Sequence, residues 1–131
     1  MANIAHTITR SYKDQSSVIT QLIETPTGNA ELNLDVQAPN AANTQYHMAF
    51  TRANLQSLLI YAAAAMTLYT NDTSGGTPQD TIPLVAGQVL VWTPATDLIT
   101  HCPFSGNVTT LYVTNASGSA ATFRVRALVN Q

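Results

Sequence analysis

Hydrophobic and polar residues alternate along most of this chain, in short runs that are separated by turn residues. Residues 30–36 read Ala-Glu-Leu-Asn-Leu-Asp-Val, which puts four apolar side chains on one side and three polar ones on the other. Residues 121–129 follow the same pattern, with arginines at the polar positions 124 and 126. Neighbouring side chains of a strand point to opposite faces, so this period of two predicts half-buried β-strands.

Runs of this kind recur along the chain at a spacing of roughly 8–12 residues, which is typical of all-β sandwiches and barrels. The clearest expected strands cover residues 4–10, 17–25, 30–36, 46–50, 80–85, 88–93, 108–114 and 121–129. Pro83 places its run at a sheet edge or a bend, because proline has no amide hydrogen for the ladder. We therefore predict an all-β, antiparallel sandwich or barrel of about eight strands, in one domain that covers residues 1–131.

One stretch, residues 55–69, has two interpretations. Leu55, Leu58, Leu59 and Ala62 have helical spacing, and the four consecutive alanines that end at Ala65 favour a helix. The alternative is two strands, at residues 57–62 and 65–70, joined by a tight alanine-rich turn. The composition of the second half favours strand. We expect the two strands, because the runs on both sides are strands.

Charged residues are scarce, and this limits the classes of partner. Lysine and arginine number 5, aspartate and glutamate 7, and charged residues make up 9% of the chain, against about 25% in typical proteins. The formal net charge is −2, and no basic stripe exists that could bind nucleic acid. The longest apolar run is about half of what a membrane helix needs. A surface of small neutral polar groups suits a protein that stays in contact with other protein molecules.

No motif for catalysis or metal binding emerges. His6, His47 and His101 have no metal-ligand spacing, and we expect Cys102 to be a buried, inert thiol. Solvation in turns or on polar strand faces accounts for the acidic residues. These are Asp14, Glu24, Glu31, Asp35, Asp72, Asp80 and Asp97. We expect no enzymatic activity, no cofactor and no metal.

The single tryptophan, Trp92, lies in the apolar run Val-Leu-Val-Trp. An aromatic platform for sugars could use Trp92 together with the tyrosines. Its place within an apolar strand favours packing in the core or between subunits instead.

The stretch from residue 57 to 128 resembles small virion proteins of tailed bacteriophages. The resemblance lies in an order of elements: Ser-Leu-Leu-Ile-Tyr at 57–61, Met-Thr-Leu-Tyr-Thr-Asn at 66–71, a loop, and Val-Leu-Val-Trp at 89–92. It ends with Tyr-Val-Thr-Asn-Ala-Ser-Gly at 112–118 before a final strand. These patterns cover more than half of the chain and are loose patterns of β proteins.

The resemblance implies a jelly-roll-like cement, or decoration, protein on the outside of a phage capsid, made in the host cytoplasm. Its partners would be the major capsid protein shell and further copies of itself, as a homodimer or homotrimer, with no nucleic acid and no membrane. The alternative function is a receptor- or glycan-binding module of a phage tail or fibre.

The N-terminal residues match nothing in this resemblance, and we expect residues 1–16 to form an assembly arm or an edge strand. An edge strand offers unpaired amides and carbonyls to a partner. The run from Asn3 to Thr9 alternates and carries no lysine, arginine or carboxylate before Arg10. The candidate interface residues are Ile4, His6, Ile8, Arg10 and Tyr12.

Overall fold

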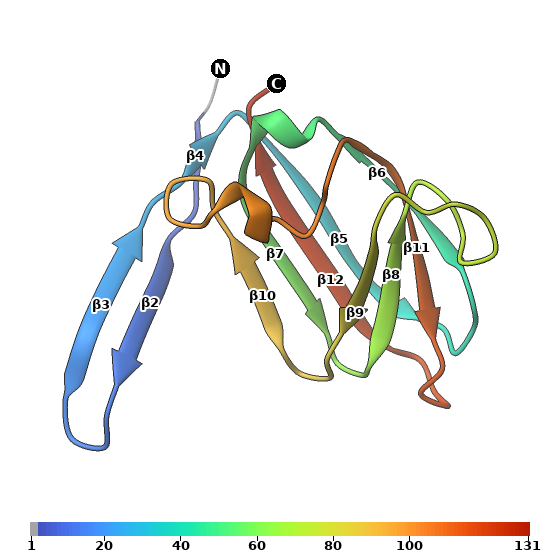
Figure 1. The fold of residues 1–131 in the computed structure, drawn as a ribbon, viewed down its shortest axis with the longest axis horizontal. Helices are drawn as coiled ribbons and strands as arrows, with labels where there is room; N and C mark the ends of the chain where they lie inside the picture. The colour runs from blue at the N-terminus through green and yellow to red at the C-terminus, as the bar shows by residue number, and fades with distance from the viewer. Residues whose placement is uncertain (1–2) are drawn as a thin grey trace.

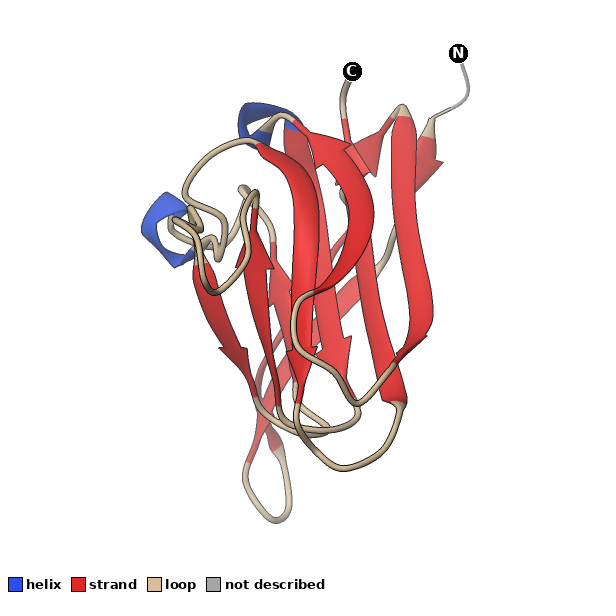
Figure 2. Cartoon of the chain, turned by 90° about the vertical axis from the view of Figure 1, so that its right-hand side faces the viewer, coloured by secondary structure: helices blue, strands red, loops and turns tan. Residues whose placement is uncertain are grey.

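The computed structural model describes residues 3–131 and contains two four-stranded antiparallel sheets that pack face to face (Figures 1 and 2). The all-β antiparallel sandwich that the sequence predicts is therefore confirmed. One sheet has the order β10-β7-β12-β5 and the other the order β6-β11-β8-β9. The strands are β5 (Ala30–Ala38), β6 (Thr44–Phe50), β7 (Leu55–Ala62), β8 (Met66–Thr70), β9 (Thr81–Leu84), β10 (Val89–Trp92), β11 (Val108–Asn115) and β12 (Ala121–Val129).

Four further strands precede the sandwich, in two antiparallel pairs. β2 (Ile8–Lys13) and β3 (Val18–Glu24) form a hairpin, and β1 (Ile4–Ala5) pairs with β4 (Thr27–Gly28). Two single-turn 3₁₀ helices, η1 (Arg52–Asn54) and η2 (Ile99–His101), lie in connections between strands.

The sandwich has the strand order of a jelly roll, which is a long hairpin wrapped into two sheets. Strands at equal distance from the β8–β9 connection pair with each other: β8 with β9, β7 with β10, β6 with β11, and β5 with β12. Two further pairings, β12 with β7 and β11 with β8, complete the sheets. Most of these contacts join residues far apart in the sequence.

The core lies between the two sheets and is built from the inward-facing residues of each strand. Ile60 and Val125 from one sheet, and Leu68 and Leu111 from the other, are fully buried. On β5 the inward residues Leu32, Leu34 and Val36 are partly buried against the same core. This matches the alternation in the sequence, since only one side of each strand faces the partner sheet.

Residues 55–69 form two strands, as expected, and not a helix. β7 and β8 belong to opposite sheets, and the alanines from Ala63 to Ala65 carry the chain from one to the other. Alanine favours a helix locally, but an isolated helix of this length is marginal in water. The strand arrangement instead pairs β7 on both sides and buries its apolar residues in the core.

Three single-residue expectations also agree with the structure. Trp92 is buried, with 2% of its surface exposed, and Cys102 is buried without a disulfide partner. Pro83 lies on β9, the outermost strand of its sheet, so its missing amide hydrogen removes no bond from a central strand.

Candidate protein-interaction site

The β2–β3 hairpin projects from the sandwich (Figure 1). It exposes apolar side chains on both of its faces. Ile19 and Ile23 are 59% and 61% exposed, and Tyr12 is 68% exposed. An isolated two-stranded hairpin is marginally stable at best in water, because it has no layer on which to bury its side chains. This hairpin is therefore the part of the described chain that most needs cover from another molecule.

The strand register assigns these side chains to two faces. Arg10 pairs with Leu22, and Tyr12 pairs with Thr20. By register and alternation, Ile8, Arg10 and Tyr12 share a face with Thr20, Leu22 and Glu24. We call this face of the hairpin the inner face, because Arg10 and Glu24 on it reach the sandwich. Ile19, Gln21 and Ile23 occupy the opposite, outer face.

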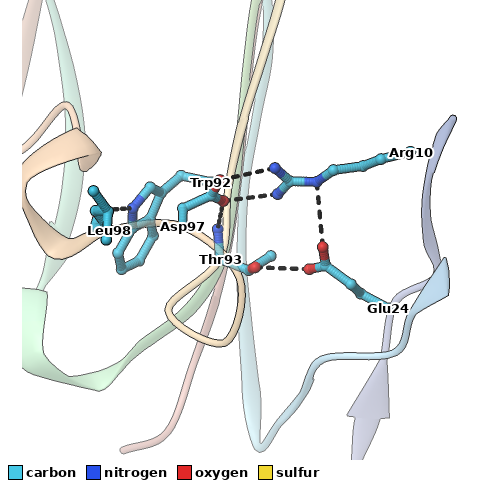
Figure 3. A network of polar contacts seen from close by, with 6 residues as sticks. All are labelled: Arg10, Glu24, Trp92, Thr93, Asp97 and Leu98. Carbon is cyan, nitrogen blue, oxygen red and sulfur yellow. Dashed lines mark hydrogen bonds and ion pairs between the residues drawn. The ribbon is translucent and has the colours of Figure 1, made fainter. Parts of the chain in front are cut away.

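The root of the hairpin is fixed to the sandwich by Arg10, which lies between two carboxylates (Figure 3). Its Nη1 and Nη2 donate to Oδ1 and Oδ2 of Asp97 over 2.8 and 2.7 Å. Its Nε lies 3.3 Å from Oε1 of Glu24, an ion-pair distance, although the alignment does not make a hydrogen bond. We call these three residues, with Thr93, the root clamp.

Thr93 joins the two carboxylates to the sandwich. Its hydroxyl donates to Oε2 of Glu24 and its amide donates to Oδ2 of Asp97, each over 2.7 Å. The preceding Trp92 donates from Nε1 to the carbonyl of Leu98 over 3.1 Å, which holds the loop that carries Asp97 (Figure 3). These bonds thus fix the position of the hairpin root relative to the sandwich.

The charges of the clamp reinforce one another. The hydrogen bonds from Arg10 lower the pKa of the Asp97 carboxyl, against a smaller opposing effect of burial. The same hydrogen bonds raise the pKa of Arg10. Both directions favour the charged pair. A bidentate arginine–carboxylate contact of this kind is among the stronger polar interactions in proteins.

A second contact holds the segment before the hairpin against the outer face of the β10-β7-β12-β5 sheet. His6 Nε2 lies 3.1 Å from Oε2 of Glu31, and Ser57 Oγ lies 3.4 Å from His6 Nδ1. The hydrogen bond from His6 is the main cause that lowers the pKa of Glu31. Since the carboxylate accepts, His6 Nε2 is the donor in the contact with Glu31.

Serine, histidine and glutamate in this order are also the components of a hydrolytic triad. Here Ser57 is buried and pairs with Leu128 of β12, and β10 pairs with β7 from the next residue, Leu58, onward. Amides committed to a sheet ladder do not stabilise an oxyanion. In this structure the contacts of His6 hold the N-terminal segment against the sheet.

Gly28 allows this segment to lie close to the sheet. A Cβ atom at this position would stand 2.6 Å from the carbonyl oxygen of Val129 and 3.0 Å from Cγ of Leu128. The backbone approach therefore requires glycine here. It brings β4, and β1 paired to it, over the end of β12.

The five interface residues expected from the sequence divide into three groups. Ile4, His6 and Ile8 are half-buried along the segment that meets the sandwich, Arg10 lies in the root clamp, and only Tyr12 is largely exposed. The structure places the expected arm, residues 1–16, in β1, in β2 and in the start of the hairpin turn, with Met1 and Ala2 outside the described residues.

Two features of the site were missed by the sequence interpretation. The apolar residues of β3, from Val18 to Ile23, are exposed, although the run reads like a core strand. Apolar residues occur at both 18 and 19 and at both 22 and 23. This break in the alternation was the sequence signal that the strand does not bury a single face. The expectation that solvation accounts for the carboxylates is wrong for Glu24, Glu31 and Asp97, which hold Arg10, His6 and Arg126.

Other kinds of site were sought in the same structure. Within residues 3–131, no three or more histidine, cysteine, aspartate or glutamate side chains gather as metal ligands would. Over the same residues, no helix has the length and apolar character to cross a membrane. No protein-family model, curated protein or solved structure matches this chain.

The pKa directions predict a dependence of stability on pH. Asp97 and Glu31 have pKa values below their ordinary values of 3.8 and 4.5, so their contribution is present above those values and is lost as the pH falls through the lower folded-state pKa. We expect the thermal midpoint to fall more steeply below pH 4.5 in the wild type than in the D97N/E31Q variant. Scanning calorimetry between neutral and acidic pH measures both, and parallel profiles would contradict the assignment.

Proposed function

We propose that this protein is a structural virion protein that binds the outer surface of a phage capsid and cements neighbouring shell subunits. The observation that carries the proposal is the projecting hairpin, with its apolar side chains uncovered and its root clamped to a rigid sandwich. The resemblance of residues 57–128 to small virion proteins supplies the class of partner. The jelly-roll strand order agrees with that resemblance, since this fold is used widely in virus particles.

The clamped root prepares the hairpin for binding. A segment that becomes ordered only on binding has a lower affinity, because the loss of conformational entropy opposes binding. Arg10, Glu24 and Asp97 fix the direction of β2 and β3 before any partner arrives. The apolar side chains can then be covered at a lower entropic cost.

The low charge suits repeated contacts on a shell. Interface cores are depleted of charged side chains, and this chain has twelve of them in 131 residues. Between residues 11 and 23 of the hairpin, the charged side chains are Lys13 and Asp14. Weak contacts repeated over many symmetric copies add through avidity, so each single contact can remain modest.

Binding to shells tests the proposal directly. Capsids of the parent phage that lack the protein are mixed with the purified full chain and sedimented. We expect saturation at a fixed number of copies per shell and a higher temperature of shell disruption. Absence of co-sedimentation at micromolar concentration would refute the cementing function.

A matched pair of variants tests the part played by the hairpin. Ile23→Lys places a charge on an exposed apolar position, and Gln21→Lys places the same charge on the same face and strand. We expect Ile23→Lys to weaken shell binding by about tenfold or more, as loss of an interface anchor does, and Gln21→Lys to have a smaller effect. Unchanged shell binding by Ile23→Lys would remove the hairpin from the binding surface.

A further inference from the structure

A second apolar surface lies on the sandwich itself, at the outermost strand β10. Leu59 and Tyr61 on β7 pair with Val91 and Val89 on β10. By alternation these four side chains face away from the core, in which Leu58, Ile60 and Trp92 are buried. We call these four residues the β10 strip. Val89 is 53% exposed, and the other three are half-buried.

The strip continues into a groove of about 400 Å³ at the root of the hairpin. Ile8, Leu59 and Val91 give the groove an apolar lining, and His6 and Arg126 also border it. Strip and groove together form a band two strands wide along the edge of the sheet.

The chain's own hairpin reaches only the root end of this band, where Ile8 lines the groove with Leu59 and Val91. Figure 1 shows that β2 and β3 leave the sandwich beside β10 and extend away from it. The root clamp fixes that direction, since it ties Arg10 and Glu24 to the loop after β10. Tyr12 and Leu22 on the inner face of the hairpin and Val89 on the β10 strip therefore stay exposed in the same molecule.

We infer that the inner face of the hairpin packs on the β10 strip of a second copy of this chain. The inference rests on the proposed assembly function and names one partner of the hairpin. Both surfaces are two strands wide, and both are apolar. The arginines beside the strip are each paired with a carboxylate, Arg124 with Asp35 and Arg126 with Glu31.

Size favours an exchange in which each copy both gives and receives a hairpin. A seven-residue strand rises about 3.3 Å per residue, and a two-stranded ribbon is ~10 Å wide, so one face covers only a few hundred Å². A stable interface buries ~800 Å² per partner. One such face is roughly 230 Å² by these dimensions, so a given and a received hairpin together bury roughly 460 Å² per copy, which is twice one contact and lies in the range of weak, concentration-dependent interfaces. Such contacts close into a dimer or a ring when the symmetry is closed.

Sedimentation velocity of the full chain at micromolar concentration tests the exchange. We expect a concentration-dependent oligomer for the wild type. Leu22→Lys, on the inner face, and Val89→Glu, on the strip, should each raise the dissociation constant by about tenfold or more. Gln21→Lys adds the same charge next to Leu22 but on the outer face, and should leave the oligomer intact.

The double variant L22K/V89E tests the pairing of the two surfaces. Its opposite charges would meet across every contact, so we expect it to associate more tightly than either single variant. Three outcomes would each overturn the inference. The wild type could stay monomeric, Gln21→Lys could weaken the oligomer as much as Leu22→Lys does, or the double variant could associate no more tightly than the single variants. Shell binding is measured separately, so loss of shell binding with an intact oligomer would refute the cementing function alone.

Discussion

Replacement of Trp92 by alanine is expected to lower the free energy of unfolding by about 3–5 kcal/mol, the usual cost of truncating a large buried aromatic side chain. Trp92 is 2% exposed and lies on β10, the outermost strand of its sheet. Its removal leaves a cavity and also leaves the carbonyl of Leu98 without its indole donor. Urea denaturation followed by far-ultraviolet circular dichroism measures the change.

The variant Trp92→Phe separates packing from hydrogen bonding. Phenylalanine keeps much of the ring but cannot donate to Leu98, so we expect a smaller loss than for alanine. If the alanine variant were as stable as the wild type, Trp92 would not be a core residue. The assignment of the β10 strip to the outer side of the sheet would then fail as well.

Replacement of Arg10 by methionine is expected to release the root of the hairpin. Glu24 is 9% exposed and Asp97 is largely buried, and without Arg10 the two carboxylates have no cation between them. Loss of one partner from a buried ion pair costs about 3–5 kcal/mol. Arg10 is 32% exposed, so solvent screening reduces the expected cost to about 2 kcal/mol.

The effect of Arg10→Met should be local. Amide hydrogen exchange is expected to accelerate over residues 8–24 and to remain slow in β7 and β12, which lie in the middle of their sheet. The variant R10M/E24Q/D97N, which removes all three charges, should recover part of the protection. Uniform acceleration across the whole chain would show that the clamp supports the entire fold and not the hairpin alone.

The sequence by itself determined the class of the fold and much of the core. The sequence predicted strands at residues 30–36, 108–114 and 121–129. The structure confirms all three, the last with the same ends and the first two extended to Ala38 and Asn115. Alternation also gave the direction in which Leu32, Phe123 and Val125 point. These properties follow from the local geometry of a strand, in which each residue faces opposite to the next, and they need no knowledge of the partner strands.

Only the tertiary structure decided which surfaces meet and which stay open. The run from Val18 to Glu24 has the composition of a core strand, but within residues 3–131 its only strand partner is β2, so its apolar residues remain exposed. The clamp joins Arg10 to Asp97 across 87 positions of the chain, a separation on which alternation carries no information. Burial and charge pairing depend on the order in which strands lie side by side, and that order is set by long-range packing.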